Sequence, residues 1–180
     1  LVMLSTPTDL APLDSAGEWA KLAEATATAA IDLIRVEPNY AALQAALRQV
    51  AHVFHFVGHG VFDEANQQGC LALQSEASSA DFVAADQLAI LLAGCKTLRL
   101  VLLNACQGAV TGTRSAFAGI AQRLVQNEVP AVIAMQAPIY EEHALRFSQE
   151  FYRALADGYS VEHAVSEGRK AINEVAYTWG

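Results

Sequence analysis

A histidine and a cysteine are the residues of this sequence best suited to covalent chemistry. His59 stands within a Gly-His-Gly triplet, and Cys106 stands within the segment Asn-Ala-Cys-Gln-Gly. A thiol is a strong nucleophile only as the thiolate, and a neighbouring imidazole can hold or remove its proton. The pair therefore indicates nucleophilic attack by sulfur on a carbonyl carbon.

Each of these residues follows an apolar segment with the length of a buried strand. Residues 52–57 precede the histidine triplet, and residues 98–103 precede the cysteine segment. In open α/β sheets, catalytic groups lie beyond the carboxyl ends of parallel strands, where loops converge. Glycines permit backbone paths that bulkier residues resist, so we expect a functional loop around His59. We expect His59 and Cys106 to project from the same edge of one sheet.

The rest of the sequence alternates between short apolar runs and segments of helical periodicity. This alternation is typical of a parallel sheet with helices on both faces. The expected strands are 1–5, 31–36, 52–57, 70–73, 98–103 and 131–135; the expected helices are 84–93, 115–127, 141–156 and 161–175, with two more starting near residues 15 and 39. The expected helix caps are a Ser15–Glu18 capping box, Asn39, Gly94 and Ser160.

The composition favours one compact domain over residues 1–180. Hydrophobic residues make up 53% of the chain and charged residues 17%, which excludes disorder as the main state. No apolar run is long enough to span a bilayer, and no secretion signal opens the sequence, so we expect a soluble cytoplasmic protein without a membrane partner. The chain starts at Leu1, inside an apolar run, which suggests a domain of a longer protein.

The charge balance argues against nucleic acid as a partner. Eleven basic and 19 acidic residues give a formal net charge of −8, and the sequence contains no Lys/Arg cluster that would neutralise phosphates.

The other cysteines and histidines have simpler interpretations. Three cysteines without a CxxC pair fit free thiols in a reducing compartment, and Cys70 and Cys95 are expected in the core. His55 lies on an apolar strand, where a hydrogen-bonded core role is the expectation, and similar structural roles are expected for His52, His143 and His163. A zinc site built from His55, His59 and Cys106 would need a geometry that this spacing does not demonstrate, so neither a metal nor a cofactor is predicted.

These segments resemble a known family. Caspases carry Gln-Ala-Cys-x-Gly with a histidine about 50 residues upstream, and residues 104–108 with His59 are similar. The sequence is closer to the bacterial, caspase-like CHAT domains, which are often joined to TPR repeats: residues 55–60 resemble their Gly-His-Gly segment, and residues 104–106 resemble their Asn-Ala-Cys segment. Later segments at 117–120, 151–155 and 158–161 also resemble this family, which implies a three-layer α/β/α sandwich around a mostly parallel sheet of about six strands.

The resemblance also implies an activity. It identifies the chain as a cysteine endopeptidase in which Cys106 is the nucleophile, His59 is the catalytic histidine, and the backbone N–H groups of Gly60 and Cys106 bind the oxyanion. The implied partners are a protein substrate and regulatory repeat or sensor domains elsewhere in the full chain, in a bacterial signalling or defence pathway.

The residues expected to form the substrate pocket are less standard. Caspases have Gln at the position of Asn104, which lines the pocket for the side chain before the scissile bond; an uncharged Asn104 argues against a strong preference for Arg or Lys from that position. Asp63 or Glu64, near His59, could supply a negative charge to the pocket instead. Gln136, at the start of residues 136–139, is expected to form another wall.

Two alternatives stay open at this point. A catalytically inactive, caspase-like scaffold would keep the fold without a reactive Cys106 thiol. A doubly wound small-molecule binder would have a pocket at a topological switch point and no close approach of His59 to Cys106.

Overall fold

The structure is a computed structural model that describes residues 1–27, 31–111, 116–135 and 141–173. For residues 105–111, 141 and 173, the description covers the backbone alone. Within these ranges, no helix is both long enough and apolar enough to cross a membrane.

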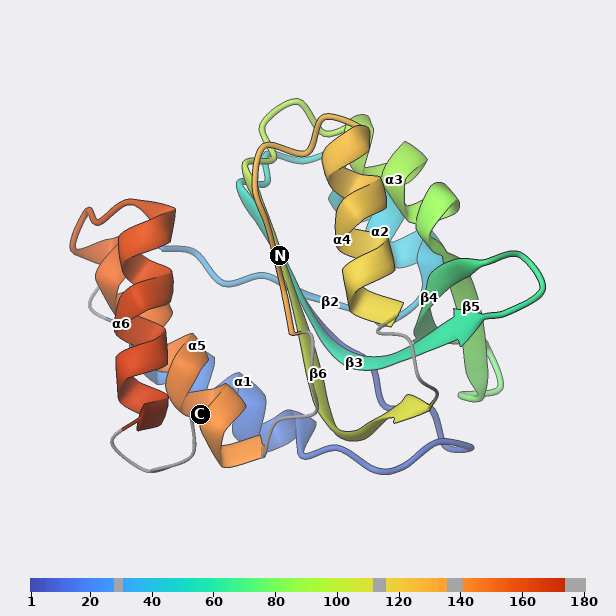
Figure 1. The fold of residues 1–180 in the computed structure, drawn as a ribbon, viewed down its shortest axis with the longest axis horizontal. Coiled ribbons are helices and arrows are strands. Elements are labelled where there is room, and N and C mark those ends of the chain that lie inside the picture. The colour runs from blue at the N-terminus through green and yellow to red at the C-terminus, as the bar shows by residue number, and fades with distance from the viewer. Residues whose placement is uncertain (28–30, 112–115, 136–140, 174–180) are drawn as a thin grey trace. The chain divides into compact units, whose positions relative to one another are not determined.

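Strands and helices alternate along much of the chain (Figure 1). The strands are β1 (Val2–Leu4), β2 (Arg35–Val36), β3 (Val53–Asp63), β4 (Gln68–Gln74), β5 (Ala80–Ala84), β6 (Leu100–Thr111) and β7 (Val132–Ala134). The helices are α1 (Ser15–Thr26), α2 (Tyr40–Ala46), α3 (Ala85–Ala93), α4 (Ala116–Gln126), α5 (Glu141–Ala156) and α6 (Val161–Asn173).

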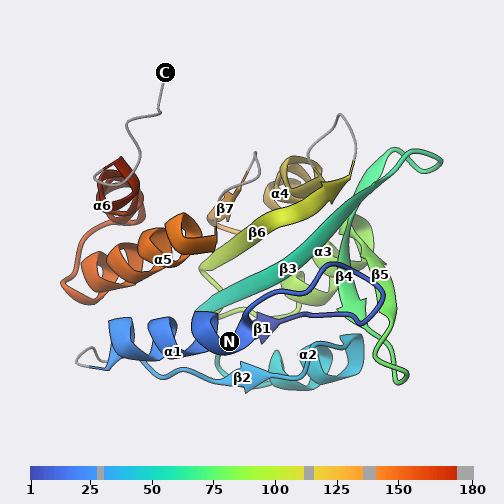
Figure 2. The same cartoon turned by 90° about the horizontal axis from the view of Figure 1, so that it is seen from below.

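The strands form a mostly parallel sheet in which β3 is central. β3 pairs in parallel with β1 on one side and with β6 on the other, while β2 and β7 extend the sheet beyond them. Past the end of β1, β3 continues into an antiparallel hairpin with β4, and β5 follows antiparallel to β4 (Figure 2). The α/β class with a mostly parallel sheet is thus confirmed, and the seven strands and six helices among the described residues are consistent with the three-layer caspase-like sandwich.

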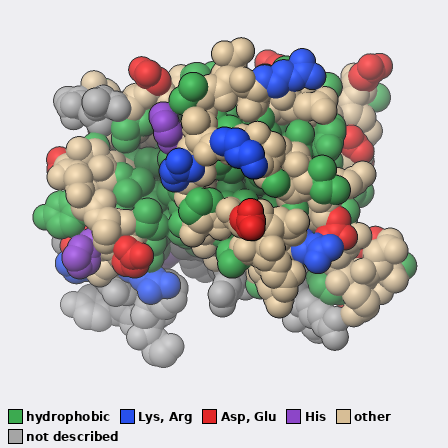
Figure 3. Space-filling model, turned by 90° about the horizontal axis from the view of Figure 1, so that it is seen from above, with side chains coloured by type: hydrophobic (Ala, Val, Ile, Leu, Met, Phe, Trp, Pro, Cys, Tyr) green, Lys and Arg blue, Asp and Glu red, His purple; other side chains and the backbone are tan. Residues whose placement is uncertain are grey.

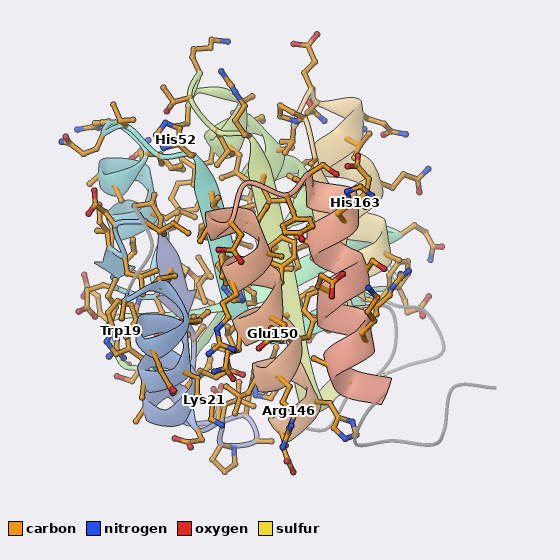
Figure 4. All side chains as sticks on the ribbon, turned by 90° about the vertical axis from the view of Figure 1, so that its left-hand side faces the viewer. Trp19, Lys21, His52, Arg146, Glu150 and His163 are labelled. Atoms are coloured by element: carbon orange, nitrogen blue, oxygen red, sulfur yellow. The ribbon has the colours of Figure 1, made fainter. Side chains whose placement is uncertain are left out.

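The chain divides into two compact units. Unit 1 comprises Leu1–Leu13 and Ile34–Pro138, and includes the whole sheet with α2, α3 and α4. Unit 2 comprises Asp14–Leu33 and Ile139–Gly180, in which α5 packs against both α1 and α6. Figure 4 labels Trp19 and Lys21 on α1 of this unit.

The main core of unit 1 lies on one face of the sheet. Side chains alternate between faces along a strand, and Phe54 and Phe56 of β3 join Val101 and Leu103 of β6 in a fully buried cluster. Helix α4 adds Phe117, whose ring centroid lies 6.4 Å from that of Phe56. This packing holds β3 and β6 side by side under α4.

Several elements differ from the sequence-based expectations. The prediction of a loop around His59 is wrong, because β3 continues through residues 58–60 as a strand; β6 likewise continues through residues 104–108. A strand that the sequence did not predict, β5, follows a stretch rich in Ser and Ala, and its residues alternate too weakly to signal a strand. The second strand is reduced to the two residues of β2.

Some of the expected helix caps are confirmed by the structure and one is wrong. Asn39 caps α2 by accepting a hydrogen bond from the Ala42 N–H, and Gly94 ends α3, as predicted. The Ser15–Glu18 capping box is wrong: Asp14 is the N-cap of α1, and Glu18 is fully buried. Asp14 stands one residue before the expected cap, and its carboxylate can accept hydrogen bonds from the free backbone N–H groups of the first helical turn. The Ser15–Glu18 spacing therefore pointed to the wrong residue.

Helix α4 approaches β4 closely at Gly69. A Cβ atom at this position would lie 2.2 Å from the backbone oxygen of Ala116, which cannot move independently of α4. Gly94, at the end of α3, has a helical backbone conformation, and its nearest neighbouring atom would lie 3.5 Å from an added Cβ.

Gly69→Ala is expected to lower the free energy of unfolding by about 1–3 kcal/mol, because the methyl group would force α4 away from the sheet. Chemical denaturation measures this change. Gly94→Ala is the matched control: it is expected to change stability by less than about 1 kcal/mol, in the stabilising direction, through the unfolded chain. Equal effects of the two substitutions would contradict the close approach at Gly69.

The buried His55 makes stability depend on pH. Complete burial lowers its pKa to about 3, against about 6.5 in the unfolded chain. Below pH 6.5 the unfolded chain binds a proton that the buried, neutral His55 does not. The free energy of unfolding therefore falls as the pH drops from 6.5 towards 3, by about 2 kcal/mol at pH 5. His55→Gln should flatten the pH dependence of the unfolding free energy between pH 7 and 5. An unchanged slope would show that His55 does not titrate in this way.

Candidate active site

His59 lies where the neighbour of β3 changes. The pairing of β3 with β1 ends at Val57, and its pairing with β4 begins at Gly60. His59 is the second residue after Val57, so it sits between the end of one neighbouring strand and the start of the next. Its side chain is 4% exposed. The imidazole is therefore carried by β3 itself, at the change of neighbouring strand, and not by a loop.

The pairing between β3 and β6 is interrupted at the same point. Gly58 is in register with Ala105, whereas Gly60 is in register with Val110. On β3, His59 alone lies between these pairs; on β6, residues 106–109 do. The backbone of Cys106 therefore immediately follows the residue opposite Gly58, as His59 immediately follows Gly58. Neighbouring strands are about 4.8 Å apart, so Gly58 and Ala105, the residues immediately before the two candidate catalytic residues, lie side by side.

The two glycines beside His59 allow close packing on the opposite face. A Cβ atom at Gly60 would lie 2.5 Å from the Phe117 ring, and one at Gly58 would lie 2.6 Å from the Phe56 ring. Because side chains alternate along β3, His59 points away from these rings. The Gly-His-Gly triplet thus presents the imidazole on one face while α4 packs against the other.

The His59 ring is held by a backbone carbonyl. Its Nε2 atom lies 2.8 Å from the oxygen of Ala11, in the segment that follows β1. A carbonyl oxygen can only accept a hydrogen bond, so Nε2 must carry the proton. In the neutral ring, Nδ1 is then the unprotonated nitrogen and can accept a proton.

Asn104 lies on β6 in register with Val57 of β3. Its side chain is completely buried, and neither its amide oxygen nor its amide nitrogen makes a hydrogen bond in the part of the chain that the structure describes. Buried amides without partners are uncommon because each unsatisfied group is costly.

Asp63 is engaged in the turn that joins β3 to β4. Its carboxylate accepts hydrogen bonds from the Ala65 N–H and from the side chain and backbone N–H of Asn66. These bonds, the one from the Asn66 side chain first, lower the pKa of Asp63. Its role in a substrate pocket stays a prediction.

The structure describes some of the remaining predicted residues and not others. Gly60 lies on β3, in register with both Leu71 and Val110. The Cys106 side chain and the whole of Gln136 lie outside the described part of the chain. His55 is fully buried, as expected, and burial lowers its pKa to about 3, which keeps it neutral at physiological pH.

Cys70 and Cys95 are buried free thiols, as predicted. Burial, followed by the negative charge of Asp63, raises the pKa of Cys70, which lowers its reactivity. No group of three or more His, Cys, Asp or Glu side chains that could hold a metal ion occurs among the described residues.

Two contributors to the site were not identified from the sequence. The Ala11 carbonyl belongs to the backbone of a distant segment and has no side-chain signature. Phe117 belongs to the segment 117–120 that resembles the family, but its contact with Gly60 depends on how α4 packs against the sheet and is not visible in the sequence.

Comparison with known proteins supports the resemblance seen in the sequence. A search of curated proteins finds no match to this chain. The model of the family described as "CHAT domain" matches residues 5–178, nearly the whole sequence. This range includes both His59 and Cys106. The chain therefore belongs to the CHAT domain family, which is related to the caspase-like cysteine peptidases.

Proposed function

We propose that this chain is a cysteine endopeptidase that uses His59 and Cys106 as a catalytic dyad. The observation that carries the proposal is the interrupted register between β3 and β6, in which His59 and the backbone of Cys106 follow the paired residues Gly58 and Ala105. The proposal requires the thiol to lie on the same face of the sheet as His59.

The hydrogen bond to Ala11 gives His59 its part in the reaction. With the proton of the neutral ring on Nε2, the lone pair of Nδ1 accepts the thiol proton of Cys106. The thiolate sulfur attacks the carbonyl carbon of the scissile peptide bond, and the carbonyl π electrons move to the oxygen. The resulting imidazolium then donates the proton from Nδ1 to the departing amine as the C–N bond breaks.

Hydrolysis of the thioester completes the cycle. His59 removes a proton from water, the hydroxide attacks the acyl carbon, and the sulfur leaves and recovers its proton from the imidazolium. The backbone N–H groups of Gly60 and Cys106 are proposed to stabilise the oxyanion in both steps. Gly60 suits this role because it has no side chain to obstruct its N–H group.

Asn104 is proposed to contact the substrate residue before the scissile bond. Support comes from its position two residues before Cys106 and from its buried amide, which has no hydrogen bond within the described structure. A neutral amide favours a polar, uncharged partner. Asp63 and Gln136 remain proposed walls of the same pocket.

The dyad predicts that Cys106 is the most reactive thiol in the chain and that this reactivity depends on His59. Alkylation by iodoacetamide at pH 6.5, followed by site-resolved mass spectrometry, measures it. His59→Ala should slow the alkylation of Cys106 about tenfold or more, because an ordinary thiol is mostly protonated at this pH. Hydrolysis of a peptide library by the full protein should disappear in both His59→Ala and Cys106→Ala.

His163→Ala is the matched control, since His163 is an exposed histidine on α6. It should leave both the alkylation rate and the hydrolysis unchanged. Cys70 and Cys95 should stay unmodified in the folded protein. A Cys106 thiol that reacts equally fast in the presence and absence of His59 would contradict the dyad and favour a scaffold role.

A further inference from the structure

One end of unit 1 is positively charged in a protein whose net charge is −8. Neither residues 38–62 nor residues 87–127 contain an Asp or a Glu. These two segments include the starts of β3 and β6, which lie side by side. The sequence shows no cluster of cations because they come from two separate segments.

Hydrogen bonds join the loops that lead into the two strands. The Thr97 hydroxyl donates to the Ala51 oxygen at 2.9 Å, and the Arg99 N–H donates to the His52 oxygen at 2.8 Å. Four exposed side chains on these loops form what we call the basic end: Arg48, His52, Lys96 and Arg99. His52 is labelled at this end in Figure 4, and Figure 3, which views the side where β3 and β6 begin, shows blue side chains with green ones between them.

The charges of the basic end are not neutralised locally. Arg48, Lys96 and Arg99 form no ion pair among the described residues, whereas arginines on α4 and α5 pair with carboxylates. The guanidinium of Arg99 donates instead to the backbone oxygens of Lys96 and Leu98, which fixes its position. Glu128 shares a hollow of about 190 Å³ with Lys96 and Arg99 without pairing with either.

An apolar groove lies beside these cations. It has a volume of about 290 Å³, lies between α2 and α3, and has Leu47, Leu91 and Arg48 in its lining. Ile90, on the same groove, is 75% exposed, and Val50, two residues after Arg48, is 66% exposed. These are the most exposed large hydrophobic side chains among the described residues. Contiguous exposed apolar surface rimmed by polar residues is typical of a binding surface, and this groove shares Arg48 with the basic end.

We propose that the basic end and the α2–α3 groove together bind an acidic, amphipathic segment of a partner protein. Apolar side chains of that segment would enter the groove against Ile90, and its carboxylates would meet Arg48, Lys96 and Arg99. A protein segment fits better than a nucleic acid, because the groove beside the cations is lined by apolar side chains, which an amphipathic segment can cover.

The position of this surface has a consequence for the catalytic site. β3 and β6 begin at the basic end, whereas His59 lies beyond the point where β1 ends. A bound segment would therefore not cover the position of His59. The surface is suited to recruiting or holding a partner without occupying that end of β3.

The test uses a helical peptide of about 18 residues with leucines on one face and glutamates on the other. Binding to the ¹⁵N-labelled protein is measured by NMR titration. We expect saturable shifts centred on Ile90, Leu91 and Arg48. The double variant Arg48→Glu/Arg99→Glu should weaken binding about tenfold, and Ile90→Ser should weaken it several-fold.

The controls separate this surface from a general charge effect. Arg169→Glu changes an exposed arginine of α6 and should leave the affinity within about twofold; a peptide with glutamine in place of glutamate should bind weakly. The proposal is overturned if the peptide does not bind, if the shifts map elsewhere, or if Arg169→Glu has the same effect as the double variant. Stronger binding of a thymidine oligonucleotide or of phosphatidylserine vesicles at the basic end would overturn it in favour of those partners.

Discussion

The parallel pairing of β3 with β6 is the interaction on which the rest of this structure depends. The two strands run in register from Val53 to Gly58, and they resume their pairing at Gly60 after an interruption on β6. The first part builds the centre of the sheet, because Phe54 and Phe56 pack with Val101 and Leu103 in one buried cluster. The interruption brings His59 beside the start of the cysteine segment.

Packing against one face of β3 accompanies the placement of His59 on the other face. The glycines on both sides of His59 let the rings of Phe56 and Phe117 approach the strand, so α4 can pack directly over this part of the sheet. His59, on the opposite face, lies at the point where β4 replaces β1 as the neighbouring strand. The Ala11 carbonyl then selects the tautomer. This hydrogen bond holds the imidazole of the proposed base in one orientation.

Much of this arrangement could be predicted from sequence, for a clear reason. The parallel sheet follows from alternating apolar runs and helical periods, and β1, α5 and Asn39 as a cap fall where those patterns place them. His59 and Cys106 were identified because few residue types can perform covalent chemistry. The order of strands, the continuation of β3 through Gly-His-Gly, and the Ala11 hydrogen bond could not be predicted in this way. Each depends on contacts between segments that are far apart in the chain, and local patterns do not encode those contacts.

The measurement that tests the central claim most directly is disulfide formation between positions 59 and 106 in His59→Cys under mild oxidation. Cysteines can bridge only when their Cα atoms are within about 7 Å of each other, which the β3–β6 register predicts for this pair. Mass spectrometry should find the 59–106 bridge in most of the protein, whereas Val57→Cys, which is in register with Asn104, should form little bridge to Cys106. A reduced Cys106 in the oxidised His59→Cys protein, or bridging to Cys70 or Cys95 instead, would contradict the account.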